Sequence, residues 1–156
     1  FMIRILQPWY ANIGKRIVKR PKLYLRDSGL FHALLSIEKP EQLYASPKLG
    51  ASWEGFAMDC ICRTLGKEDA DLYFWHTHGG AELDLFWQWG GQYWGAEFKY
   101  EDAPRLTRSM QTALEDLQLA RLWVVYPGKS SYALADNIQV VPLSHVGAIW
   151  NYEQTS

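Results

Sequence analysis

The sequence predicts an α/β (α+β) fold in which a mixed central sheet is flanked by helices. Apolar residues recur at helical spacing over 52–65, and the period then changes to the alternation of strands over 71–78, 82–89 and 92–100. The nearly continuous apolar run at 120–126 is typical of a strand that is covered on both faces. This order of helix, three strands, helix and further strands suits a sheet packed between helices.

The first 45 residues are expected to form an appendage made of a hairpin and a short helix. Extended segments at 2–10 and 15–25 surround Asn12-Ile13-Gly14, whose residue types favour a turn. Asp27 or Ser28 can cap a helix that runs to about Ile37. The apolar side of this helix is expected to hold Leu30, Phe31, Leu34 and Leu35.

Residues 46–156 are expected to form the main domain, after a proline-containing linker at 38–47. Helices are predicted from Ser52, as a cap, to about Leu65, and from Pro104 to about Leu117. A single edge strand is predicted at 132–141, followed by a short helix. Because the chain opens at Phe1 inside a strand-like segment, we expect it to be a fragment of a longer polypeptide.

The charge and cysteine content limit the function classes. A net charge of −1 over 156 residues argues against a uniformly basic nucleic-acid surface but permits a local patch. Basic residues do crowd near the amino terminus beside aromatic ones, which suits phosphate contact and base stacking. The alternative is a solvated face or a domain contact. The predicted nucleic-acid-binding residues are Lys15, Arg16, Lys19 and Arg20.

The two cysteines, Cys60 and Cys62, are too close on one helix to bridge, which favours a reducing, cytoplasmic setting. Cys60 is expected in the core. His76 and His78 share a strand face, but two ligands without a third do not make a zinc site. No apolar run approaches the length of a bilayer, so no membrane partner is expected.

Glu82–Tyr100 is the most informative stretch, because Gly90-Gly91 is a strong signal for a two-residue hairpin turn. If Trp89 pairs with Gln92, then Asp84 lies opposite Glu97. Alternation predicts one core face, made of Leu83, Leu85, Trp87, Trp89, Trp94, Ala96 and Phe98. The other face is predicted to carry Glu82, Asp84, Phe86, Glu97 and Lys99.

Two carboxylates directly across a strand pair lie roughly 5 Å apart and repel each other. A divalent cation between Asp84 and Glu97 would remove that cost, and Mg²⁺ is commonly held by few carboxylates with retained waters. The alternative is a solvated polar face on which Glu82 forms an ion pair with Lys99, which the same register places opposite it.

An acid on one strand, Glu-x-Lys on the next and a preceding helix with a Glu resemble the PD-(D/E)xK nuclease superfamily. The matching parts are Glu54 in SWEGF, Asp84 in AELDLFW, and Glu97 and Lys99 in GAEFKY. The resemblance implies a restriction-endonuclease-like fold with Mg²⁺ or Mn²⁺ held by Asp84 and Glu97. It also implies that Lys99 activates water and that Glu54 supports the metal, so these four are the predicted catalytic residues.

The run NIGKRIVKRPKLYLRDSGLFHALL, followed by GASWEGF, ELD and EFK, resembles an uncharacterised carboxyl-terminal domain of bacterial and archaeal AAA-type ATP-binding proteins. This resemblance implies an upstream ATPase module and a winged-helix segment, of which residues 1–45 would be a remnant. The chain contains no G-x-x-x-x-G-K-[ST], so we expect no ATP site of the P-loop type within it.

Three functions stay open at this point. The first is a Mg²⁺-dependent nuclease domain acting on DNA or RNA. The second is a catalytically silent nuclease-fold domain that docks nucleic acid or protein for the ATPase, and the third is an unrelated α/β interaction domain. If residues 1–35 form a surface that is normally covered, a homodimer through that surface is expected.

Overall fold

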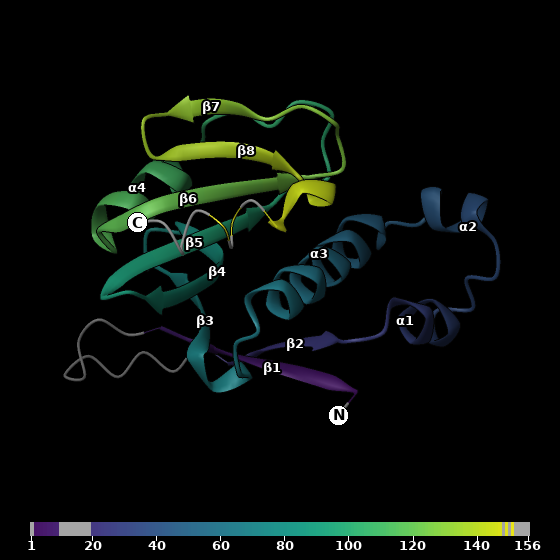
Figure 1. Ribbon diagram of the computed structural model, residues 1–156. Helices are drawn as coiled ribbons and strands as arrows, with labels where there is room; N and C mark the ends of the chain where they lie inside the picture. The colour runs from purple at the N-terminus through teal and green to yellow at the C-terminus, as the bar shows by residue number, and fades with distance from the viewer. Residues whose placement is uncertain (1, 10–19, 148, 150, 152–156) are drawn as a thin grey trace.

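The computed structural model describes residues 2–9, 20–147, 149 and 151, and its main feature is one mixed sheet (Figure 1). Among these residues the sheet has eight strands in the order β2-β1-β3-β4-β5-β6-β8-β7. The predicted mixed sheet flanked by helices is therefore confirmed. The strands are β1 Ile3–Pro8, β2 Lys22–Leu25, β3 Leu72–His76, β4 Glu82–Trp89, β5 Gln92–Phe98, β6 Leu119–Tyr126, β7 Tyr132–Ala135 and β8 Ile138–Pro142.

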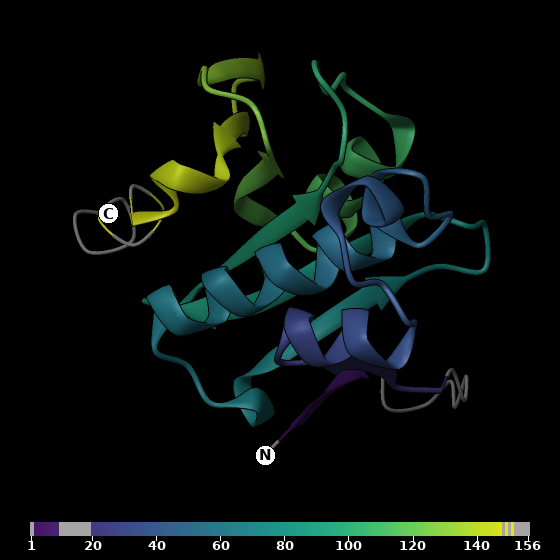
Figure 2. The same cartoon turned by 90° about the vertical axis from the view of Figure 1, so that its right-hand side faces the viewer.

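Helices cover the two faces of this sheet. The helices α1 (Ser28–Leu34), α2 (Pro40–Tyr44) and α3 (Leu49–Leu65) lie in front of the sheet in Figure 2. The helix α4 (Arg108–Asp116) packs against β4 and β6 and belongs to a separate apolar cluster. The central strands of the sheet are thus buried on both sides.

Two apolar clusters make the core. On the α3 side, Ala57, Met58 and Ile61 pack against strand residues that include Trp87 and Trp94. On the α4 side, Met110 and Ala113 pack against β4, β6 and β8. Each Leu, Phe or Met side chain that is fully buried in such a cluster contributes about 1.5–3 kcal/mol to folding. The central strands are therefore held from both faces.

The predicted assignment of faces on β4 was wrong at two positions. Tyr73 pairs with Phe86 and Trp75 with Leu83, so two steps along β3 oppose three along β4. This β-bulge shifts the alternation, because the extra residue has no partner. Leu83 joins Phe86 in the α4-side cluster, whereas Leu85 joins the α3-side cluster. Phe86 is only 1% exposed, which overturns its predicted place on a polar face.

Helix α3 begins four residues earlier than predicted, at Leu49, with Lys48 in place of Ser52 at the cap position. Ser52 does not cap it; its hydroxyl lies 2.7 Å from Nε2 of His32 instead. Gly66 ends the helix in the left-handed conformation, at φ 61°. The predicted linker at 38–47 contains the short helix α2, because Pro40 stands at the first helical turn, where proline needs no hydrogen-bond donor.

The later elements differ from the prediction at their boundaries. Helix α4 begins at Arg108 rather than Pro104, because the Thr107 hydroxyl caps it by accepting from the Met110 amide at 3.2 Å. The single strand predicted at 132–141 is a pair, β7 and β8, joined around residues 136–137. The short helix predicted after this strand begins as a 3₁₀ turn at Leu143–His145.

The amino-terminal segment joins the main sheet. Strand β1 pairs antiparallel with β2 and parallel with β3, while the turn predicted at residues 12–14 lies outside the described residues. The Asp27 carboxylate caps α1 by accepting from the Leu30 amide at 2.8 Å, as predicted. The apolar side predicted for α1 is not buried, since Leu34 is 68% exposed.

Candidate functional site

The β4–β5 hairpin has the predicted register. Trp89 pairs with Gln92, and the ladder continues to Leu85 and Ala96. Gly90 and Gly91 adopt positive φ angles of 58° and 76°, which suit the tight turn that joins twisted strands. Beyond Leu85 the ladder gives way to a side-chain contact, since Oδ2 of Asp84 accepts a hydrogen bond from the Phe98 amide at 3.0 Å.

Glu97 is one of two carboxyl groups whose pKa Asp84 raises. Burial raises the pKa of Glu97, repulsion from Asp84 raises it further, and the result is a pKa of about 7. The Lys99 ammonium and the Asp84 amide act in the opposite direction. Burial contributes more to this shift than repulsion from Asp84 does.

Lys99 follows β5 and belongs to the same group. Its amide donates to the Val125 carbonyl at 2.9 Å, so the backbone is fixed against β6. Its ammonium lies 2.7 Å from Oε1 of Glu97. Burial alone would lower the pKa of Lys99, but attraction and hydrogen bonding to Glu97, with attraction to Asp84 and Glu101, raise it overall. The Glu82–Lys99 pair predicted from the register is replaced by this contact, and Glu82 pairs with Lys22 instead.

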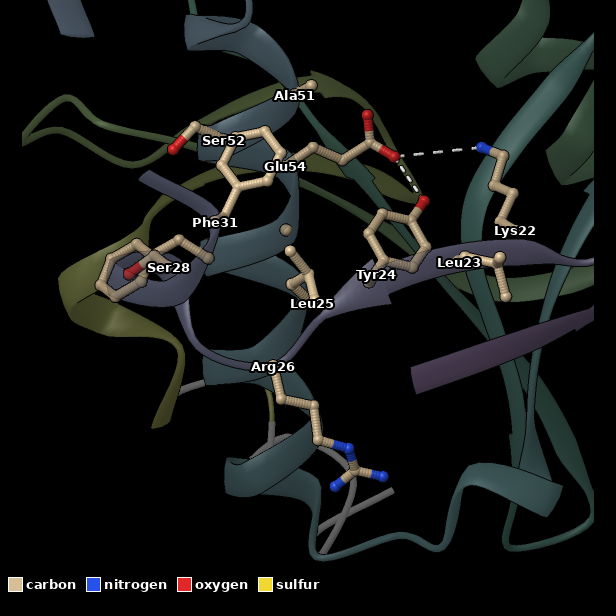
Figure 3. Close-up of a pocket in the computed structure, with 12 residues that line it drawn as sticks. Lys22, Leu23, Tyr24, Leu25, Arg26, Ser28, Phe31, Ala51, Ser52 and Glu54 are labelled. Atoms are coloured by element: carbon tan, nitrogen blue, oxygen red, sulfur yellow. Dashed lines mark hydrogen bonds and ion pairs between the residues drawn. The ribbon is translucent and has the colours of Figure 1, made fainter. Parts of the chain in front are cut away.

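Glu54 reaches the same region from α3 (Figure 3). The Tyr24 hydroxyl donates to Oε1 of Glu54 at 2.5 Å, and Nζ of Lys22 lies 4.0 Å from the same oxygen. Burial raises the pKa of Glu54, and Asp84 raises it further. The four predicted catalytic residues, Glu54, Asp84, Glu97 and Lys99, are therefore linked electrostatically, with Asp84 in the middle.

Lys22 is the residue that sequence reasoning missed. Its ammonium pairs with Glu82, lies 3.4 Å from Oδ1 of Asp84, and sits 5.2 Å from the centre of the Phe74 ring. Burial alone would lower the pKa of Lys22, but attraction to Asp84 and the other acids raises it overall. Lys22 and Tyr24 stand two apart on β2 and so share a face, which is a signal that the sequence does contain.

A pocket of about 280 Å³ opens beside these groups, between β2 and α3 (Figure 3). Lys22, Arg26 and Glu54 are its charged lining residues, and Tyr24 adds a neutral hydroxyl. The remaining wall is largely apolar or small and includes Phe31, Ser52, Gly55 and Phe56. The site thus has room for a small polar or aromatic group next to the carboxylates.

The donors at this site fit a hard divalent cation. Asp84, Glu97 and Glu54 offer carboxylate oxygens, the ligands that Mg²⁺ prefers. Within residues 2–9, 20–147, 149 and 151, no group of three or more His, Cys, Asp or Glu is arranged to hold a metal ion. Mg²⁺ is commonly held by one or two carboxylates with retained waters.

The other predicted residues lie elsewhere. Lys15, Arg16 and Lys19 are outside the described residues, and Arg20 is exposed just before β2. Both cysteines are free thiols, and the prediction that Cys60 lies in the core is wrong. Cys62 is the buried one, with a pKa raised by burial to about 12, while Cys60 is half-buried.

His76 ends β3, and its ring stacks on Phe74 at a centroid distance of 6.0 Å. His78 follows in the loop that leads to β4. Among the helices that the structure describes, none is long and apolar enough to cross a membrane.

Two comparisons with known sequences bear on the family. Residues 49–146 match a domain of unknown function, DUF4143, and residues 1–41 match another, DUF8612. Uncharacterized proteins of Mycobacterium tuberculosis and Mycobacterium bovis are each 46% identical over 145 residues. The alignment covers 93% of this chain but 32% of each relative, and no solved structure matches. By its match over residues 49–146, the chain belongs to the DUF4143 family.

Proposed function

We propose that this chain is a metal-dependent phosphodiesterase domain of the PD-(D/E)xK type, acting on nucleic acid. The observation that supports it best is the meeting of Asp84 and Glu97 where the β4–β5 ladder ends, with the Lys99 ammonium on Glu97. Burial and mutual repulsion make this pair unfavourable when both groups are ionised. A bound cation would remove that cost.

Asp84 and Glu97 would hold Mg²⁺ or Mn²⁺. When bound, such a metal stabilises charge on the phosphate and lowers the pKa of a coordinated water. Lys99 can donate to a phosphate oxygen or orient the attacking water, because its ammonium already lies 2.7 Å from Glu97. Glu54 can accept hydrogen bonds from water on the α3 side of the site.

A silent docking module is the second candidate, and one observation favours it. The Lys22 ammonium already pairs with Glu82 and lies 3.4 Å from Asp84, which reduces the repulsion between these acids. A nuclease-fold domain without catalytic activity would keep these ion pairs of Lys22 because they stabilise the fold. In that case the pocket between β2 and α3 would serve binding rather than cleavage.

The wider setting is also a proposal. Because the alignment covers only 32% of each mycobacterial relative, a full-length protein has room for the upstream ATPase module that the sequence resemblance implies. The two free thiols support a reducing, cytoplasmic compartment. A cytoplasmic ATPase that moves on DNA or RNA would bring substrate to this domain.

Calorimetric titration with Mg²⁺ and Mn²⁺, beside a cleavage assay on DNA and RNA, tests the proposal. Asp84→Asn should lose most of the metal affinity, since it removes one of two anionic ligands. Lys99→Ala should keep metal binding, while cleavage falls by about 10²–10⁴-fold, the usual size of a lost acid–base contribution.

The exposed residues Asp116 and Lys129 provide matched controls, as Asp116→Asn and Lys129→Ala. Both control variants should behave like the wild type. If wild-type protein binds neither ion at millimolar concentration, with or without nucleic acid, the docking module is the better account.

A further inference from the structure

We propose that Lys22 couples metal loading to nucleic-acid binding, an inference that rests on the proposed function. In the metal-free protein the Lys22 ammonium occupies the place of a cation among the carboxylates. A divalent ion can take that place only when Lys22 leaves. A phosphate group of the substrate would give Lys22 its new partner.

The contacts of Lys22 show how closely it imitates a bound cation. It pairs with Glu82, lies 3.4 Å from Asp84 and reaches within 4.0 Å of Glu54. These acids come from two different elements, β4 and α3, and Lys22 comes from a third, β2. One positive charge faces three carboxylates, so the site keeps a net negative charge that can attract a stronger cation.

Asp84 makes the competition direct. Its Oδ1 faces Lys22 at 3.4 Å, and its Oδ2 accepts from the Phe98 amide at 3.0 Å. Both oxygens of this ligand are therefore engaged. A metal on Oδ1 of Asp84 would lie close to the Lys22 ammonium, and two cations so near each other repel. Lys22 is the one that can leave, because a flexible side chain moves more easily than a backbone amide fixed beside β6.

The Lys22 side chain has space into which it can move. Its side chain is 25% exposed and lines the pocket between β2 and α3, which the substrate would approach. An ammonium on a flexible stem binds phosphate as a point charge, without a fixed orientation. Movement by Lys22 toward a phosphate would free the Asp84 oxygen for the metal.

Such an exchange is reciprocal. If nucleic acid draws Lys22 away and so raises metal affinity, the metal must raise nucleic-acid affinity by the same factor. The protein alone would then hold metal weakly and would assemble its reactive centre only on substrate. Removing the Lys22 charge should abolish this requirement.

The test is calorimetry with Mn²⁺ on Lys22→Met, with and without a phosphorothioate DNA duplex and an RNA duplex of the same sequence. Without nucleic acid, Lys22→Met should bind Mn²⁺ more tightly than wild type, on the order of tenfold, as coupled ligands usually behave. Nucleic acid should raise the Mn²⁺ affinity of wild type and leave that of Lys22→Met nearly unchanged.

Lys67→Met is the matched control, because Lys67 also contacts an aromatic ring, that of Trp89 at 4.4 Å, away from this site. Lys22→Arg keeps the charge and should behave like the wild type. Lys22→Gln supplies a second neutral variant that can still hydrogen-bond a carboxylate. If both neutral variants are unfolded without metal, Mn²⁺ must restore their folding; failure to do so overturns the inference.

The outcomes separate this inference from the proposed function. If wild type binds Mn²⁺ through Asp84 but Lys22→Met binds it equally or more weakly, the coupling is overturned and the proposed function stands. If no variant binds Mn²⁺ even with nucleic acid present, both are overturned.

Discussion

Glu97 is a carboxyl group for which burial and a neighbouring charge act together. Only 7% of it is exposed, and the raised pKa means that the folded protein holds this proton more tightly than the unfolded chain does. The stabilisation is fully present below the ordinary value of 4.5, and it is lost as the pH rises toward about 7. Glu97 thus makes the metal-free protein more stable in mild acid.

Glu97→Gln should remove this pH dependence, because an amide does not ionise. As the pH rises from 4.5 to about 7, the free energy of unfolding of the wild type should decrease relative to that of Glu97→Gln. The expected loss is on the order of 3 kcal/mol, since each pKa unit corresponds to about 1.4 kcal/mol. Urea unfolding at a series of pH values measures it, with the exposed Glu115→Gln as control. If the unfolding free energies of wild type and Glu97→Gln change with pH in the same way, Glu97 does not have a raised pKa in the folded protein.

At the scale of the element, the bulge in strand β4 brings the Leu83 side chain close to Gly95 of strand β5. A Cβ added at Gly95 would lie 2.8 Å from one methyl group of Leu83 and 3.1 Å from one of Leu119. Both leucines are in the α4-side cluster, at 0% and 5% exposed. Gly95 is therefore a position of close packing within the sheet.

Gly95→Ala should destabilise the protein by about 1–3 kcal/mol, the usual cost of overpacking a core. Gly50→Ala is the matched control, because Gly50 is in α3 and a Cβ there meets nothing within 4 Å. That control should be neutral or stabilising by about 0.5–1 kcal/mol, because alanine favours helix. Chemical denaturation of both variants measures the difference. Equal stability of the two would show that Leu83 does not point toward Gly95.

At the scale of the whole molecule, one face of the β1–β2 edge of the sheet has no cover among the described residues. Ile3 and Ile5 of β1 are 52% and 49% exposed, and Leu23 of β2, which pairs with Ile5, is 67% exposed. β2 is also the terminal strand of the sheet. Apolar edge strands of this kind associate with other surfaces.

We expect concentration-dependent dimers through this face. Ile5→Lys and Leu23→Lys should each shift the protein to a monomer, because a buried ammonium would oppose association. Sedimentation at several concentrations measures the mass. Leu34→Lys is the control, since Leu34 is equally exposed at 68% but lies on α1. A wild-type monomer at every concentration would count against the expectation.

Much of the fold follows from local sequence patterns, and so does the part of the candidate site that lies on the β4–β5 hairpin. The double glycine at 90–91 determines the hairpin register, because a two-residue turn leaves few ways to pair the strands. That register brings Asp84 near Glu97, and spacing by two brings Glu97 near Lys99. The capping of α1 by Asp27 and the end of α3 at Gly66 were equally local. Each depends on residues close together in the chain.

Only the tertiary structure decided the rest. The bulge in β4 arises from pairing with β3, so no period within β4 itself could reveal that Leu83 and Leu85 face opposite ways. The pairing of Lys22 with Asp84 joins residues 62 positions apart, across strands that are not neighbours in the sheet. Charge and spacing identify which residues can ionise on one strand face. The order of the strands determines which of them meet, because electrostatic interactions depend on distance in space.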